Sequence, residues 1–114
     1  MKYFSPLFLT LLILSACNSP KAEIDSAQSQ VHYDLGLELA QYSLYQNSIE
    51  ELALAIKFDP GNVKAYRKKG LIHFGLRQYD KAETLFKKTI ALEPENVQAH
   101  INLGMVKYSK GDKA

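Results

Sequence analysis

One cysteine and three histidines are the residues best suited to chemistry in this 114-residue chain. Cys17 is the only thiol, so neither an internal disulfide nor a zinc site of several thiolates can form. His32, His73 and His100 are spaced by an internal repeat rather than by metal geometry, and we expect structural roles for them. No serine-hydrolase, zinc-protease, Walker A or dinucleotide-binding motif is present. We therefore predict no enzymatic activity, no metal site and no cofactor.

Cys17 follows a stretch that is typical of exported proteins. Met1-Lys2 provides a positive start, and residues 3–14 are uncharged and mostly apolar. A membrane-spanning helix needs about 20 apolar residues, and this run is shorter. The pattern predicts a signal peptide over residues 1–16.

The end of that stretch, Leu14-Ser15-Ala16-Cys17, resembles the lipobox of bacterial lipoproteins. The resemblance implies cleavage before Cys17 and acylation of that cysteine, which would anchor the protein in a membrane. Asn18, where inner-membrane lipoproteins of enterobacteria carry Asp, favours the outer membrane with the protein facing the periplasm. The alternative is an ordinary secretory signal that leaves Cys17 as a free thiol.

The segment after the cysteine has few large apolar residues. Residues 17–28 are predicted to be a tether, because they include Ser, Asn, Gln and Pro20. Fully extended, twelve residues would reach about 40 Å. We expect the tether to hold the following domain close to the membrane without pressing it against the surface.

The rest of the chain is an internal repeat. Residues 29–62 and 63–96 align without a gap, and a third copy occupies residues 97–114. A fixed period of this size indicates stacked supersecondary units. Apolar residues recur at helical spacing, so each unit is predicted to be two helices. A glycine recurs at one position inside the first helix of each unit, where a missing Cβ allows the partner helix to approach closely: Gly36, Gly70 and Gly104. A proline follows the second helix and stops it: Pro60 and Pro94.

The repeated positions resemble the tetratricopeptide repeat. The family pattern has an aromatic residue, Leu-Gly, a hydrophobic residue, a small residue after the turn, an aromatic, a second small residue and Pro. The resemblance implies an all-α fold of helix-turn-helix repeats stacked as a short right-handed solenoid. The matching residues are His32, Leu35, Gly36, Leu39, Ser48, Leu52, Ala55 and Pro60, then Tyr66, Lys69, Gly70, His73, Ala82, Phe86, Thr89 and Pro94, and finally His100, Leu103, Gly104 and Lys107.

The third copy stops where its second helix should begin. In one interpretation, the helix that starts at Val97 serves as the terminal cap of the array. In the other, the sequence is a truncated form of a longer array, or this helix packs against a partner that is not part of the chain. A cap should have a polar outer face, but this helix carries Ile101, Met105, Val106 and Tyr108. Truncation or an unmet partner is the favoured interpretation.

Charge is divided unevenly along the chain. Residues 18–62 hold two basic and seven acidic residues, a net charge of −5, whereas residues 63–114 hold eleven and five, a net charge of +6. The whole chain carries only +2, which argues against binding nucleic acid. The basic run of Lys64, Arg67, Lys68 and Lys69 is either a solvated helix face or a patch that attracts an acidic peptide, a carboxylate or lipid headgroups.

By resemblance, tetratricopeptide arrays bind peptides or partner domains on the concave face that each first helix lines. Such a groove would suit an extended segment or an amphipathic helix with hydrophobic anchors. In the alternative interpretation, Leu71, Phe74 and Met105 are ordinary core between repeats. The predicted groove residues are Tyr33, Leu37, Lys64, Arg67, Leu71, Phe74, Ile101, Met105 and Tyr108.

Lipobox, tether and repeats together resemble outer-membrane tetratricopeptide lipoproteins, closest in layout to those that help assemble type IV pilus secretins. We expect a non-enzymatic scaffold at the bacterial outer membrane that binds a protein or peptide partner of the cell envelope. The alternatives are an adaptor for periplasmic peptidoglycan enzymes or proteases, and a generic peptide-binding module.

Overall fold

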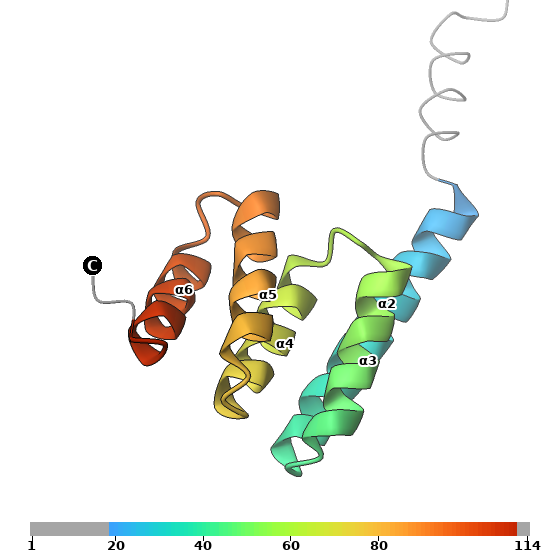
Figure 1. Cartoon of the computed structure of the whole chain (residues 1–114). Helices are drawn as coiled ribbons and strands as arrows, with labels where there is room; N and C mark the ends of the chain where they lie inside the picture. Colours follow the sequence, from blue (N-terminus) through green and yellow to red (C-terminus); the bar gives the residue numbers. More distant parts are fainter. Residues whose placement is uncertain (1–18, 112–114) are drawn as a thin grey trace, which may run out of the picture.

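The computed structural model describes residues 19–111, which form five α-helices and no strand. The predicted signal peptide and Cys17 lie outside the described residues. The prediction of an all-α fold is confirmed. The helices are α2 (Pro20–Gln41), α3 (Tyr45–Phe58), α4 (Val63–Gly75), α5 (Tyr79–Leu92) and α6 (Val97–Ser109) (Figure 1).

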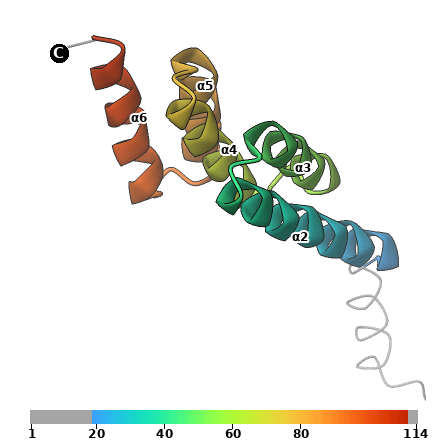
Figure 2. The same cartoon turned by 90° about the horizontal axis from the view of Figure 1, so that it is seen from below.

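The helices pack as two hairpins followed by a single helix. α2 pairs with α3 and α4 with α5, while α6 packs against α5 and contacts α4 (Figure 1). The view from below shows α3 and α5 together on one side of the molecule, with α2 and α4 on the other (Figure 2). The first helices of the repeats therefore share one face, and the second helices share the opposite one, called the outer face below.

Each hairpin closes over a glycine. A Cβ added at Gly36 would lie 2.9 Å from Leu52 Cγ, and one added at Gly70 would lie 2.7 Å from Phe86 Cε1. Both distances are shorter than real Cβ contacts, so an alanine would force a shift. The expected close approach is thus confirmed at Gly36 and Gly70. At Gly104 a Cβ would meet nothing within 4 Å among the described residues, because α6 has no second helix packed on it there.

The core consists of two small clusters of buried side chains. Tyr33 on α2 packs with the first cluster of α3 and α4, and Phe86 on α5 packs with the second, which includes Val106 of α6. Hydrogen bonds connect α2, α3 and the residue before α4: Ser29 Oγ donates to the carbonyl of Ala55 (2.7 Å) and accepts from Asn62 Nδ2 (2.9 Å). The same asparagine caps α4, so one residue both starts a helix and links two repeats.

The repeat is also visible in the backbone of the turns. Ser43 and Arg77, which follow α2 and α4, have φ angles of 62° and 60°, and Gly111 after α6 has 83°. These three residues occupy the same position of successive repeats, so each first helix ends in the same left-handed turn. The turn after α6 therefore starts with the same backbone conformation as the other two turns. Gly111 adopts this conformation without the steric penalty that a side chain brings.

The tether prediction is wrong for residues 20–28, which form the first turns of α2. Ser19 caps this helix by accepting from the backbone N–H of Ala22 (3.3 Å), and Pro20 occupies the first helical position. Ser and Pro were interpreted as linker residues, although in this order they start a helix. Nine helical residues span about 14 Å as a stiff rod, less than half their extended length.

Alanine substitutions should have opposite effects at Gly70, where Phe86 occupies the space a Cβ needs, and at Gly104, where that space is open. We expect Gly70→Ala to lower the free energy of unfolding by about 1–3 kcal/mol, because the new methyl group overlaps the buried Phe86 ring. Gly104→Ala should raise it by about 0.5–1 kcal/mol, because alanine is the better helix former and its Cβ meets open space. Urea denaturation measures both. A destabilised Gly104→Ala variant would contradict the open position.

Candidate functional site

A cleft of about 460 Å³ opens between α2 and α4. Its walls are mostly aliphatic, and Lys68 is the only residue in them that carries a charge at neutral pH. We call it the inner cleft, since it lies between two first helices. It is lined by Leu37, Ala40, Gln41, Tyr45, Lys68, Leu71, Ile72, Gly75 and Leu76.

The repeat explains why this cleft exists. Leu37 and Leu71 occupy equivalent positions of the first and second repeats, so neighbouring first helices present the same side chain. Leu37 also packs against the first core cluster, which fixes its wall. Ala40 and Gly75 place small residues near the ends of the two helices, and their missing volume leaves the hollow.

The predicted groove residues do not form one continuous site. Leu37 and Leu71 line the inner cleft, whereas Lys64 lines a separate shallow depression of about 250 Å³. Arg67 is half-buried on the same helix. Tyr33 was predicted to line the groove, but only 8% of it is exposed, because it packs on Leu52 and its neighbours in the core. Burial raises the pKa of its hydroxyl, although the nearby Arg67 guanidinium opposes the shift.

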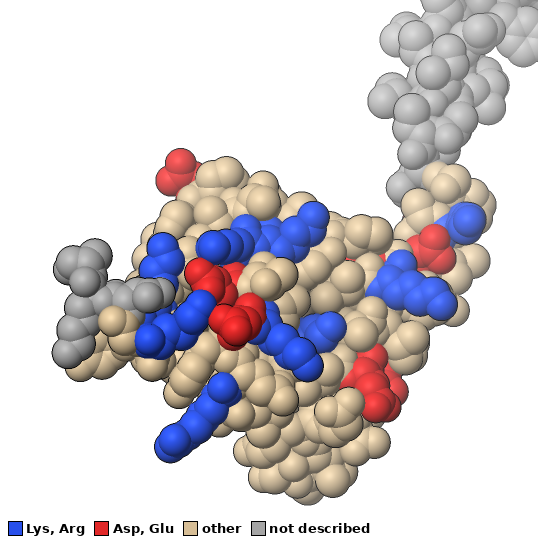
Figure 3. Space-filling view, viewed as in Figure 1, with Lys and Arg blue, Asp and Glu red and all other residues tan. Residues whose placement is uncertain are grey.

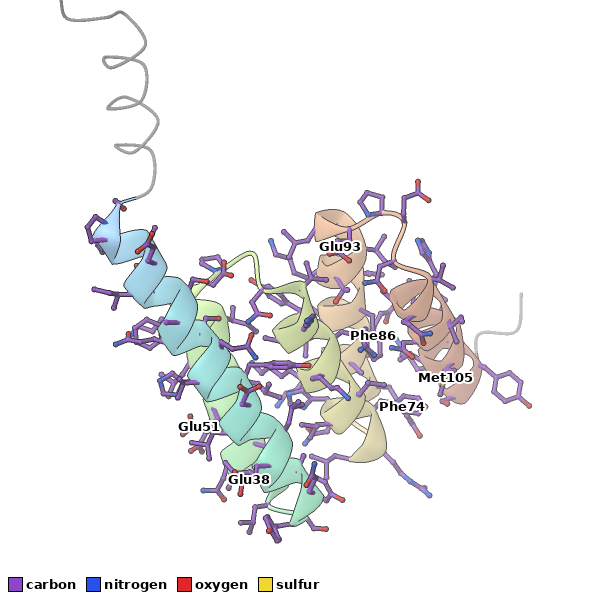
Figure 4. The ribbon with its side chains drawn as sticks, turned by 180° about the vertical axis from the view of Figure 1, so that it is seen from behind. Glu38, Glu51, Phe74, Phe86, Glu93 and Met105 are labelled. Carbon is purple, nitrogen blue, oxygen red and sulfur yellow. The ribbon has the colours of Figure 1, made fainter. Side chains whose placement is uncertain are left out.

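The C-terminal part of the predicted groove separates into core and surface. Phe74 is half-buried against the second core cluster, with its ring centroid 5.6 Å from that of Tyr79. For Phe74, therefore, the core alternative describes the packing. Ile101, Met105 and Tyr108 of α6 are 52%, 43% and 75% exposed and do not reach the inner cleft. Figure 4 shows Met105 on α6, well away from α2.

Most residues of the cleft wall were not predicted from the sequence. Lys68 was predicted only as part of a basic run, and Tyr45 was not among the predicted site residues. The repeat period could have identified Lys68 as a cleft residue, because its position on the first helix faces the preceding repeat. Tyr45 begins the second helix and reaches the cleft only because α2 and α3 fold back on each other.

A buried asparagine on α6 carries a side-chain amide group that the described residues leave unpaired. Asn102 is 6% exposed, and its Nδ2 makes no hydrogen bond among residues 19–111. It occupies the position of the third repeat that is equivalent to Lys68 in the second. An unsatisfied buried amide costs about 1–3 kcal/mol of stability, so the fold carries a local penalty at this point.

The three histidines have structural contacts. His32 stacks on Phe58 at 5.5 Å between ring centroids, and its Nδ1 lies 2.6 Å from Glu51 Oε2. His73 is buried, with Nδ1 2.6 Å from Gln78 Oε1, and His100 Nε2 lies 2.8 Å from the carbonyl of Pro94. In the described part of the chain, no three His, Cys, Asp or Glu side chains gather as metal ligands would.

None of the helices within residues 19–111 combines the length and hydropathy needed to cross a bilayer. α2 is long enough at 22 residues, but charged side chains such as Lys21, Asp34 and Glu38 are distributed along it.

Comparisons with known proteins agree with the geometry. Residues 63–96 match the family model of the tetratricopeptide repeat. The crystal structure of MamA superposes with a TM-score of 0.73 at 28% identity, covering 75% of this chain and 50% of MamA. The described chain has the tetratricopeptide-repeat fold. The second such domain of Spaghetti (RPAP3), solved with the HSP90 peptide SRMEEVD, has a TM-score of 0.75 at 20% identity and covers 81% of this chain and 85% of that one.

A curated relative also shares the repeats. Small glutamine-rich tetratricopeptide repeat-containing protein 2 of Saccharomyces cerevisiae is 30% identical over 67 residues, which is 59% of this chain. The chain spans about a fifth of the length of that relative and half the length of MamA. The likeness therefore concerns the repeats rather than the whole proteins.

Two asparagines, one inside α6 and one that caps it, should respond to substitution in opposite ways. We expect Asn102→Leu to raise the free energy of unfolding by about 1–2 kcal/mol, because a buried unpaired amide becomes an apolar group of similar size. Asn96→Ala should lower it by about 1 kcal/mol, because Asn96 Oδ1 caps the helix at the N–H of Ala99. Thermal denaturation compares them. A destabilised Asn102→Leu variant would show that the amide has a partner beyond the described residues.

Proposed function

We propose that this chain is a non-enzymatic adaptor that binds a short protein segment in the inner cleft. The observation that supports this most is a preformed apolar cleft of about 460 Å³ with a single cation in its wall. Binding sites for side-chain anchors have this character: concave, mostly apolar and with a few polar groups that set orientation. The tetratricopeptide-repeat fold is itself built for protein interaction, since stacked helix pairs form extended binding faces.

The lining defines the chemistry of the segment. Leu37, Leu71 and Ile72 would surround an aliphatic or aromatic anchor and remove it from water. Lys68 is half-buried beside them, and a carboxylate on the bound segment would pair with its ammonium group. We therefore infer an acidic segment with one large apolar anchor.

Charge reversal at Lys68 tests that specificity. The probes are synthetic ten-residue peptides that contain one leucine flanked either by glutamates or by lysines. We expect the wild type to bind the acidic peptides and the Lys68→Glu variant to prefer the basic ones, because the charge in the cleft wall has changed from positive to negative. Leu71→Glu should weaken binding by about tenfold or more, since it places a charge among apolar contacts. Fluorescence anisotropy measures the affinities.

The matched control is Ile101→Glu, which adds the same charge to an exposed position outside the inner cleft. It should leave the affinity unchanged. Equal losses in Leu71→Glu and Ile101→Glu, with both variants folded, would contradict the proposed site.

The proposed cellular position is the periplasmic face of the outer membrane, through acyl chains on Cys17. The support is the lipobox-like sequence and the Asn at position 18. The chain from Cys17 to Pro20, where α2 begins, can span at most about 11 Å. Because α2 continues without a break into the first repeat, the repeats would be held on a stiff helix rather than on a loose tether.

The anchor is tested by the intact mass and membrane fractionation of the expressed chain. We expect a cleaved, acylated product in the outer membrane, and a soluble product for Cys17→Ala, because several acyl chains give lasting attachment. Asn18→Asp is the matched control: it should keep the acyl mass and move the protein to the inner membrane. An unmodified chain that is soluble with or without Cys17 would overturn this part of the proposal.

Within the envelope, the proposed role is assembly of a type IV pilus secretin, and the alternative is an adaptor for peptidoglycan enzymes or proteases. Both rest on the combined layout of lipobox and repeats. Chemical crosslinking of intact cells distinguishes them. A secretin subunit crosslinked by the wild type and lost in Leu71→Glu supports the first role, and a cell-wall hydrolase or protease with the same dependence supports the second.

A further inference from the structure

A second cleft lies on the outer face, between the two second helices. It has a volume of about 500 Å³ and is bounded by α3 on one side and α5 on the other, with α4 contributing the two side chains Lys69 and His73. Figure 3 views this face and shows basic side chains spread across it around a few acidic ones. We call it the outer cleft. It is lined by Ile49, Lys69, His73, Asp80, Lys81, Thr84 and Leu85.

The acidic side chains of α5 are already paired. Asp80 Oδ1 lies 2.9 Å from Lys110 Nζ. Glu83 lies 2.9 Å from the same ammonium group and 3.1 Å from Lys87 Nζ. Because Lys110 comes from the end of α6, docking of that helix occupies both carboxylates. The one acidic residue in the outer cleft thus faces a lysine that is not part of the cleft.

Lys69 and Lys81 both line the outer cleft. Neither forms a salt bridge with any carboxylate of residues 19–111. Burial lowers the pKa of Lys69, and the positive charge of Lys81 lowers it further. The pKa of His73 is also lowered, first by burial and then by both lysines, while its hydrogen bond to Gln78 acts in the opposite direction. The two ammonium groups therefore repel each other at one cleft, and an anion between them would remove that repulsion.

We propose that the outer cleft binds one phosphate-type oxyanion between the ammonium groups of Lys69 and Lys81. Two lysines that line the same cleft would supply charge-assisted hydrogen bonds, which are the strong kind for an oxyanion. The volume exceeds that of a bare phosphate, so a phosphate ester fits as well. Two sources share this chemistry: a soluble phosphate compound and the headgroup of an anionic phospholipid. The outer cleft shares no residue with the inner cleft, so this inference is independent of the proposed peptide site.

The first experiment titrates the full chain with potassium phosphate, with chloride adjusted to keep the ionic strength constant. The readout is the NMR signal of the His73 imidazole, which is buried in the outer cleft. We expect saturation at a single site and a rise in the pKa of His73, since a bound anion favours the charged ring. The Lys69→Gln/Lys81→Gln variant should bind about tenfold more weakly or worse, because it loses both cations.

The matched control is Lys21→Gln/Lys107→Gln, which removes the same charge from two exposed positions outside the outer cleft. It should bind like the wild type, and this comparison also separates specific binding from the general stabilising action of phosphate on proteins. Lys81→Gln alone alters an exposed side chain and keeps the test valid if the half-buried Lys69 proves necessary for folding. Equal phosphate affinity in the two double variants, or no saturation at His73, would overturn the proposal.

A second arm identifies the source in a Cys17→Ala background, which removes the acyl anchor. The probes are vesicles of phosphatidylcholine with and without phosphatidylglycerol. Vesicle binding that needs phosphatidylglycerol and both lysines, and that free phosphate displaces, identifies the lipid headgroup as the ligand. Saturable phosphate binding without lysine-dependent vesicle binding identifies a soluble phosphate compound.

Discussion

The contact between a glycine on one helix and a large side chain on the next controls this structure. At Gly36 and Gly70 the missing Cβ admits Leu52 and Phe86, and both side chains are fully buried as a result. Each hairpin is thereby closed at a fixed distance, so its two faces are rigid surfaces on which the neighbouring repeat can pack. The inner cleft follows from this stacking, since it is the space that two rigid first helices leave between equivalent leucines.

The two faces of the stack differ because charge pairing differs between them. In the inner cleft, apolar residues surround one lysine, whereas the outer face gathers several lysines around few carboxylates (Figure 3). On the outer face Lys110 lies 2.9 Å from both Asp80 and Glu83, and within residues 19–111 neither Lys69 nor Lys81 forms a salt bridge. The carboxylates of α5 thus fasten the end of α6 rather than pairing with the lysines of the outer cleft.

Much of the fold could be predicted from the chain, and less of the candidate site. The fixed repeat period and the recurring glycines indicated the helices and their pairing, because these signals depend on local spacing. Tyr33 and Phe74 were expected in the groove but lie mainly in the core, because helical spacing places a residue on a face without showing which neighbour covers it. The start of α2 was missed for a different reason: Ser19 and Pro20 suit both a linker and a helix N-terminus.

The sequence by itself determined the all-α class and indicated the repeat period and the close helix approach at Gly36 and Gly70, since each depends on residues near in the chain. It also carries the signal-like start and the lipobox-like cysteine, which need no fold to be recognised. Only the tertiary structure decided which residues share a cleft and which lysines within residues 19–111 form no salt bridge. Those outcomes depend on distances between side chains of different helices, such as Lys69 on α4 and Lys81 on α5, and stacking sets these distances.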